Sequence, residues 1–374
     1  MATNFDILGR ENVDDLEAIL AVANTDVDAV LHTIKAEADV LFTWDYERSR
    51  PALGKLYEKA KTSQWNAETD LDWSIEVDQA EVARANQVNI PGGGLSGKDM
   101  TGTPFEKWKE DDWLQLGIEM QNWTLSQFMH GEQGALICTA QIVETVPWID
   151  AKYYAATQVV DEARHVEVFA KYLNTKLSGH YPINAHLRLL LDDIIADNRW
   201  DMTYLGMQIM VEGLALAAFG FMHQMTTEPL LKKLLRYVMS DEARHVAFGV
   251  LSLQEFYKEL NSQEIRERQE FAFEAAVRMR DRFLQQEVWE RMGLDPAEVL
   301  PIVLQDETRP VFQGMLFSKI VPNCKKLGLL DAGDGWLRDR FTDLGVIQFE
   351  DWADTGAEYE MLDEVSKDRE EQNA

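Results

Sequence analysis

The pentapeptide Asp-Glu-Ala-Arg-His occurs twice in this chain, at residues 161–165 and again 80 positions later at residues 241–245. The same offset relates two single glutamates, Glu132 and Glu212, each of which lies among small and apolar residues. The chain therefore holds two copies of one pattern, a Glu followed 30 residues later by Glu-x-x-His. Because the copies agree only sparsely elsewhere, they predict two similar helical hairpins and not a solenoid array.

The residues around both single glutamates have the spacing of a helix. Positions three and four apart share one helix face, and the face of Glu132 also holds Leu125, Met129 and Ala135. Glu212 lies on an equivalent apolar face that begins at Leu205 and Ile209. Each carboxylate is therefore expected to point into the core.

The helical pattern continues nearly unbroken from Phe105 to about Trp289. Breaks fall at Pro147, at 178–182, near Pro229 and around Asn261, and they separate helices of about 25–40 residues. Such lengths favour an all-α bundle of four helices over residues 105–295. We expect a helical N-terminal region over 1–104 with a loop at 89–104, and a C-terminal extension over 296–374 that ends in a frayed acidic tail.

Four glutamates that share a dry interior cannot all stay ionised, because burial and like charges both disfavour the charged form. Two divalent cations would balance four carboxylates and two neutral imidazoles, and this mixture of oxygen and imidazole donors suits iron or manganese. The competing interpretation is a pair of exposed amphipathic helices with salt bridges among their Asp, Glu and Arg residues. We predict a metal site, whose ligands are Glu132, Glu162, His165, Glu212, Glu242 and His245.

An aspartate precedes the ligand glutamate in each copy of the pentapeptide. A metal-bound histidine usually donates its other ring N–H to a carboxylate. In a closed bundle Asp161 could accept this bond from His245, and Asp241 could accept it from His165. Arg164 and Arg244 could then neutralise the two aspartates.

These motifs resemble the ferritin-like superfamily of di-iron carboxylate proteins over about residues 105–260. The doubled D-E-x-R-H is similar to bacterial multicomponent monooxygenase hydroxylases and, more distantly, to ribonucleotide reductase small subunits. The resemblance implies a ferritin-like bundle in which Glu132, Glu162 and His165 hold one iron and Glu212, Glu242 and His245 hold the other. It also implies that Glu162 and Glu242 bridge, that a manganese–iron pair would use the same ligands, and that O2 is a co-substrate.

Two positions depart from relatives of this kind. Phe169 stands four residues after His165, where tyrosyl-radical subunits carry a Tyr, and Val238 stands where arylamine N-oxygenases carry an extra His. We therefore expect an oxygenase or oxidase that acts on a small, largely apolar molecule by hydroxylation, N-oxygenation, desaturation or C–C cleavage. The alternatives are a radical-generating subunit and a ferroxidase. Apolar walls are expected from Leu136, Ile137, Leu214, Leu216, Phe219 and Phe169.

Charge and composition limit the partners. A formal net charge of −29 disfavours nucleic acids and anionic membrane surfaces. Only two cysteines are present, which suits a reducing compartment, and we expect a cytoplasmic homodimer served by a reductase or ferredoxin as electron donor. No membrane span is expected, because the most apolar segment, 207–225, contains Glu212 and is interpreted as a core helix.

Overall fold

The computed structural model describes residues 7–10, 12–24, 27, 29–86, 95, 98–306 and 309–352. Much of the loop predicted at 89–104, and the whole of the predicted frayed tail, lie outside these residues. Within the described part of the chain the regular structure is entirely helical, which confirms the predicted all-α class.

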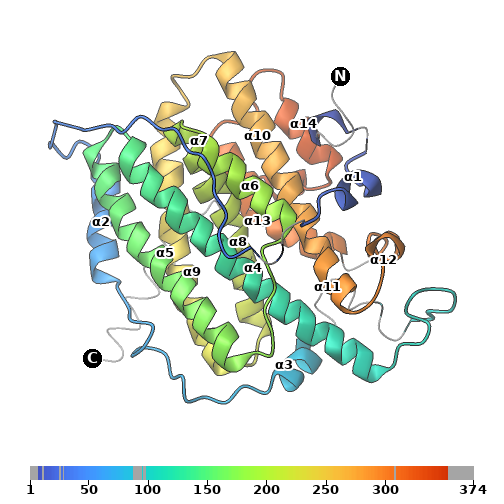
Figure 1. Ribbon diagram of the computed structural model, residues 1–374. Helices are drawn as coiled ribbons and strands as arrows, with labels where there is room; N and C mark the ends of the chain where they lie inside the picture. The colour runs from blue at the N-terminus through green and yellow to red at the C-terminus, as the bar shows by residue number, and fades with distance from the viewer. Residues whose placement is uncertain are drawn as a thin grey trace.

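Four long helices form a bundle at the centre of the molecule (Figure 1). They are α4 (Glu110–Thr145), α5 (Ile149–Lys176), the helix that ends in α8 (Glu212–Met225), and α9 (Pro229–Phe256). Helix α4 packs along α5, α8 packs along α9, and α5 also contacts α9. Each hairpin of the repeated pattern thus forms one half of the bundle.

The helix ends follow local capping chemistry. Pro229 occupies the first turn of α9, where its missing N–H costs nothing, and the Glu228 carboxylate accepts from the N–H groups of Leu230 and Leu231. Asn261 caps α10 (Ser262–Asp281) in a reciprocal capping box with Glu264. The four predicted breaks are confirmed, but two further breaks, at 197–199 and at 282–285, were missed, because no Gly or Pro marks them.

The helix that carries Glu212 is not regular. It begins as α7 (Trp200–Tyr204), continues as a π-helical stretch η4 (Leu205–Val211), and returns to α-helical geometry at Glu212. A π-turn holds an extra residue per turn, so the single regular face expected from Leu205 through Ile209 to Glu212 does not hold. The span Trp200–Met225 is apolar enough and long enough to cross a membrane, but 78% of its most apolar window is buried inside the bundle. It is a core helix, as expected.

Shorter helices surround the bundle (Figure 1). Helix α2 packs on α5 and α9, α3 on α4, α6 on α4 and α10, α13 on α8, and α14 on α10. Their bounds, with those of the remaining short elements, are η1 (Ile7–Gly9), α1 (Leu16–Leu20), α2 (Pro51–Thr62), α3 (Gln79–Asn86), α6 (Ala185–Ala196), η5 (Arg282–Leu284), α11 (Gln286–Arg291), α12 (Pro296–Val303), α13 (Arg309–Lys326), α14 (Trp336–Asp343) and η6 (Ile347–Phe349).

Helix α6 approaches α4 closely at Gly134. A Cβ atom at this position would lie 2.5 Å from a Leu191 methyl carbon, a distance that real Cβ contacts do not show. The absence of a side chain at Gly134 therefore lets α6 cover the bundle close to Glu132.

The N-terminal region is less helical than expected. Residues 31–50 form no regular structure and run across the bundle as an extended segment (Figure 1). Several of its large apolar side chains are exposed, including Leu31, Phe42 and Trp44.

Candidate metal centre

The six predicted ligands come from all four helices of the bundle and meet in its interior. Helix α4 contributes Glu132, α8 begins at Glu212, and α5 and α9 each contribute one Glu-x-x-His pair. All six side chains are buried. The interpretation of the repeats as exposed, salt-bridged helices is therefore wrong.

Each imidazole turns its Nδ1 atom toward three carboxylates. His165 Nδ1 lies 3.2 Å from Glu132 Oε2, 3.1 Å from Glu242 Oε1 and 3.5 Å from Glu162 Oε2. His245 Nδ1 lies 3.1 Å from Glu162 Oε1, 3.7 Å from Glu242 Oε2 and 3.9 Å from Glu212 Oε2. Glu162 and Glu242 therefore face both imidazoles, whereas Glu132 and Glu212 each face one.

The donor atoms fall into two overlapping groups, and within each group they lie within 4.8 Å of one another. One group holds Glu132, Glu162, His165 and Glu242, and the other holds Glu162, Glu212 and His245. Two adjacent cations could occupy these groups with Glu162 shared between them. The roles of the six residues as ligands stay a prediction.

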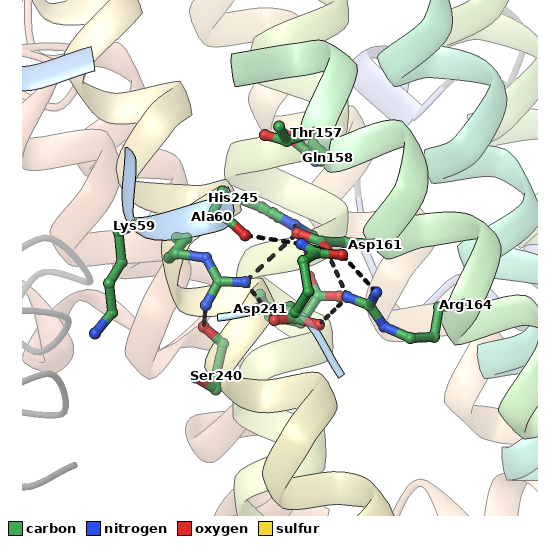
Figure 2. Close-up of polar contacts among 12 residues, drawn as sticks. Lys59, Ala60, Thr157, Gln158, Asp161, Arg164, Ser240, Asp241 and His245 are labelled. Carbon is green, nitrogen blue, oxygen red and sulfur yellow. Dashed lines mark hydrogen bonds and ion pairs between the residues drawn. The ribbon is translucent and has the colours of Figure 1, made fainter. Parts of the chain in front are cut away.

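The Nε2 atoms point away from the carboxylates, toward the aspartate of the other hairpin. His165 Nε2 lies 3.1 Å from Asp241 Oδ2, and His245 Nε2 lies 3.4 Å from Asp161 Oδ2. Figure 2 shows Asp161 and Asp241 lying close together beside Arg164, with His245 behind them. A proton on each Nε2 would leave the Nδ1 lone pair free for a cation.

Two arginines hold these aspartates in place. Arg164 Nη2 donates to Asp161 at 2.5 Å and to Asp241 at 3.1 Å. Arg244 Nη2 donates to Asp241 and lies 3.5 Å from Asp161 Oδ2. The two aspartates and two arginines form a compact, charge-balanced cluster that closes the histidine side of the site.

The electrostatics of the six residues favour a cation. Burial, reinforced by neighbouring carboxylates, raises the pKa of Glu132 and of Glu212 well above the usual range. Burial alone would lower the pKa of both histidines, but the surrounding carboxylates raise it well above the usual value. Without a metal the cluster would therefore hold protons in the place of cations.

Several of these buried atoms lie close to one another but not in hydrogen-bonding geometry, as expected of donors that converge on a metal. They are Glu162 Oε2, Glu212 Oε2, both carboxylate oxygens of Glu242, and His245 Nδ1. Buried polar atoms are rarely left unpaired. Oxygen and imidazole donors in this number fit a pair of iron or manganese ions.

A hollow opens on the carboxylate side of the cluster, opposite the aspartates. Its interior is small, about 20 Å³, and Glu132, Glu212 and Glu242 line it while neither histidine does. Its apolar lining comes from Phe128, Ala135, Val211 and Ala215.

None of the six predicted wall residues lines this hollow. Ile137 is 47% exposed, because five positions along a helix place it well round from Glu132. Phe169 and Phe219 are buried and stacked at 5.6 Å, with Phe128 against Phe219 at 4.5 Å. Phe128 lines the hollow, and Phe169 and Phe219 pack against it.

Sequence reasoning missed three residues around the cluster. Trp65 donates its indole N–H to Asp241 Oδ2 at 2.8 Å, and Gln64 donates to Asp161 at 3.1 Å. Gln158 donates to Glu162 and to Glu212, both at 2.9 Å. Only Gln158 carried a signal, since it lies one helical turn before Glu162.

Comparisons with known proteins bear on the fold. No family model and no curated protein matches the chain. Among solved structures, an R2-like ligand-binding oxidase with an aerobically reconstituted metal cofactor after photoconversion is 15% identical, with a TM-score of 0.50 over 75% of this chain and 94% of the other. A second R2-like ligand-binding oxidase structure, with an aerobically reconstituted Mn/Fe cofactor, is 15% identical with a TM-score of 0.49 over 76% and 92%. The chain has the ferritin-like fold, as its sequence predicts.

Proposed function

We propose that this protein is an O2-activating oxidase or oxygenase with a pair of metal ions in its four-helix bundle. The observation that carries the proposal is the convergence of two Glu-x-x-His pairs and two further glutamates on one dry site. Bound there, two irons, or manganese and iron, would supply the electrons and the Lewis acidity for reducing O2.

The protein's own residues divide the site into two sides. On one side Asp161 and Asp241 fix the orientation of the imidazoles and hold the proton on each Nε2. On the other side the hollow gives a small, largely apolar molecule access to the carboxylates. Its apolar lining excludes bulk water and would protect a reactive oxidant from side reactions. Hydroxylation, N-oxygenation, desaturation and C–C cleavage are all compatible with such a pocket.

Electrons must enter from an external donor, for which we propose a reductase or ferredoxin. A hydrogen-bonded chain runs from Trp65, which is 8% exposed, through Asp241 to His165. The Trp65 ring also stacks on Tyr237 at 4.9 Å. This chain supports a route for electrons from the surface. Trp65→Phe should slow reduction by the donor while leaving metal content unchanged.

The decisive experiment combines metal analysis with O2 consumption. Two metals per chain are expected, and the reduced protein should consume O2 faster with an organic substrate, which should gain oxygen or lose hydrogen. Release of ferric iron without an organic product would favour the ferroxidase. An oxidised side chain that requires a large partner subunit would favour the radical-generating subunit. A protein that holds no metal would contradict the proposal.

The radical-generating alternative has little support at the position that matters for it. Phe169, one turn after His165, is fully buried and stacks on Phe219. A phenyl ring there cannot lose a phenolic proton and electron as a tyrosine would.

We further propose a homodimer in a reducing, cytoplasmic setting. The extended segment exposes Leu31, Val40, Phe42 and Trp44, and Val160 of α5 is 54% exposed. Apolar surface of this kind is typical of an interface between subunits. Both cysteines are free and buried, which suits a reducing compartment. Light scattering after size-exclusion chromatography should give twice the mass of the 42.8 kDa chain.

A further inference from the structure

A tyrosine, a glutamine and a glutamate follow one another at intervals of four residues on two helices of the bundle. They are Tyr154, Gln158 and Glu162 on α5, and Tyr204, Gln208 and Glu212 on the helix that ends in α8. All six side chains are buried. On a regular helix this spacing lets each glutamine contact the glutamate of its own helix.

Only the α5 copy makes this contact. Gln158 Nε2 donates to Glu162 Oε1 at 2.9 Å, whereas the amide of Gln208 has no hydrogen-bond partner among the residues that the structure describes. Gln208 lies in the π-helical stretch η4, where the residue five positions on, and not four, shares its face. Its Cβ faces α9 instead, 2.6 Å from the place where a Cβ at Gly249 would lie. Glu212 therefore receives no hydrogen bond from Gln208.

Gln158 supplies a hydrogen bond to Glu212 from the other hairpin. Its Nε2 also donates to Glu212 Oε1 at 2.9 Å, so the two N–H groups of one amide reach carboxylates on two helices. The second oxygen of Glu212, Oε2, has no hydrogen-bond partner in the described part of the chain and lies 3.9 Å from His245 Nδ1. Gln158 thus occupies one oxygen of Glu212 and leaves the other for a cation.

The two ends of the metal centre differ in the number of donors that the protein offers. The compact group of donor atoms around His165 comes from four residues, and the group around His245 comes from three. Glu242 Oε2 approaches His245 Nδ1 to 3.7 Å without joining the smaller group. A cation near His245 would therefore have fewer protein donors than its neighbour, and the hold on Glu212 Oε1 keeps that number low.

The hollow lies next to this poorer end. Glu212 lines it together with Val211 and Ala215, and its interior of about 20 Å³ has room for a small molecule such as water or O2. Gln158 does not line the hollow. Its amide therefore holds Glu212 without taking up the space in which such a molecule would lie.

We infer that Gln158 is a positioning residue, which holds Glu212 to one free oxygen and thereby keeps a coordination position open on the cation near His245. The inference rests on the metal pair of the proposed function, but not on any turnover. Without the amide, both oxygens of Glu212 could turn to the cation and fill that position. A small molecule that enters from the hollow would then have to displace a carboxylate oxygen.

Nitric oxide, a diatomic of the size of O2, tests the open position without turnover. Fe(II)-loaded protein is titrated with it anaerobically, and the visible absorption of the bound form is followed. The wild type should bind nitric oxide. Gln158→Met keeps the length of the side chain but has no N–H group. It should still bind two metals, and its affinity for nitric oxide should fall about 10- to 100-fold, the range expected when a hydrogen bond to a charged group is removed.

Gln208→Met is the matched control. Gln208 is equally buried and also stands four residues before a proposed ligand, but it donates to no described carboxylate. This variant should bind nitric oxide as the wild type does. Gln158→Asn guards against misfolding, because it keeps the amide but is one methylene too short to reach both glutamates. It should fold and bind nitric oxide as weakly as Gln158→Met.

Unchanged nitric oxide affinity in Gln158→Met, or an equal fall in Gln208→Met, would overturn the inference. Loss of folding in both Gln158 variants would also overturn it, because the amide would then serve the fold. The expected pattern of nitric oxide binding in a protein that does not consume O2 would sustain this inference and refute only the proposed function. Consumption of O2 with unchanged nitric oxide affinity in Gln158→Met would do the reverse.

Discussion

Asp241→Asn is the substitution that best tests the metal centre. Asparagine keeps the size of the side chain but removes its negative charge. In the wild type Asp241 Oδ2 accepts from His165 Nε2 at 3.1 Å, from Trp65 at 2.8 Å and from Arg164 at 3.1 Å. The substitution therefore weakens the anchor of one imidazole and leaves Asp161, the anchor of the other, in place.

The expected loss follows from this geometry. Removing the carboxylate partner of a metal-bound histidine typically lowers metal affinity 10- to 100-fold, or about 1.4–2.8 kcal/mol. The loss should fall on the cation near His165 and spare the cation near His245, whose Nε2 faces Asp161 at 3.4 Å. The fold should also lose stability, toward the lower end of about 3–5 kcal/mol, because Arg164 still has Asp161 at 2.5 Å.

The assay is an anaerobic titration with Fe(II), followed by calorimetry, together with urea unfolding of the metal-free protein. The wild type should bind two metals, and the variant should bind one of them distinctly more weakly. Asp201→Asn is the matched control, because Asp201 is equally buried and pairs with Arg268 of α10. Asp201 lies about three turns before Glu212 on the same helix and contacts none of the proposed ligands. The control should lose stability but not metal affinity. An unchanged affinity in Asp241→Asn, or an equal fall in both variants, would refute the reasoning.

Three other results are expected. Glu132→Ala and Glu212→Ala should each lose about one metal per chain while circular dichroism shows nearly unchanged helicity, and a variant that keeps both metals by elemental analysis would argue against ligation. The metal-free protein should lose unfolding free energy as the pH rises above about 4.3, the pKa of an unfolded glutamate, and further above about 6.5, that of an unfolded histidine. The fold raises the pKa values of Glu132, Glu212 and both ligand histidines, so it keeps protons that the unfolded chain releases. The metal-loaded protein should change less in the same urea titrations. Gly134→Ala should cost about 1–3 kcal/mol in thermal unfolding, because its Cβ would lie 2.5 Å from Leu191, whereas Gly131→Ala, with nothing within 4 Å, should be neutral or stabilising.

The sequence predicted the parts of this molecule that depend on local periodicity. The spacing of Glu162 and His165 places both on one face of a helix, and the repeat supplies a second helix of the same kind. The repeat also predicted that Asp161 of one hairpin faces His245 of the other, and the structure shows this contact. For these residues the direction of the side chain followed once the helices were recognised.

The parts that were missed depend on packing between distant segments. Trp65 follows the end of α2 and meets Asp241 across 176 positions, a contact that no local pattern encodes. Arg282 lines the hollow only because α10 ends beside it. The π-helical stretch before Glu212 has no residue signature, since all its side chains are simply buried.

The crossed pairing of histidines and aspartates makes the two hairpins interdependent. His165 of α5 faces Asp241 of α9, and His245 of α9 faces Asp161 of α5. A half-length chain with a single hairpin would have to associate with a copy of itself to complete either contact, and its metal binding would fall on dilution. Joining both hairpins in one backbone fixes their effective concentration and makes loading independent of protein abundance.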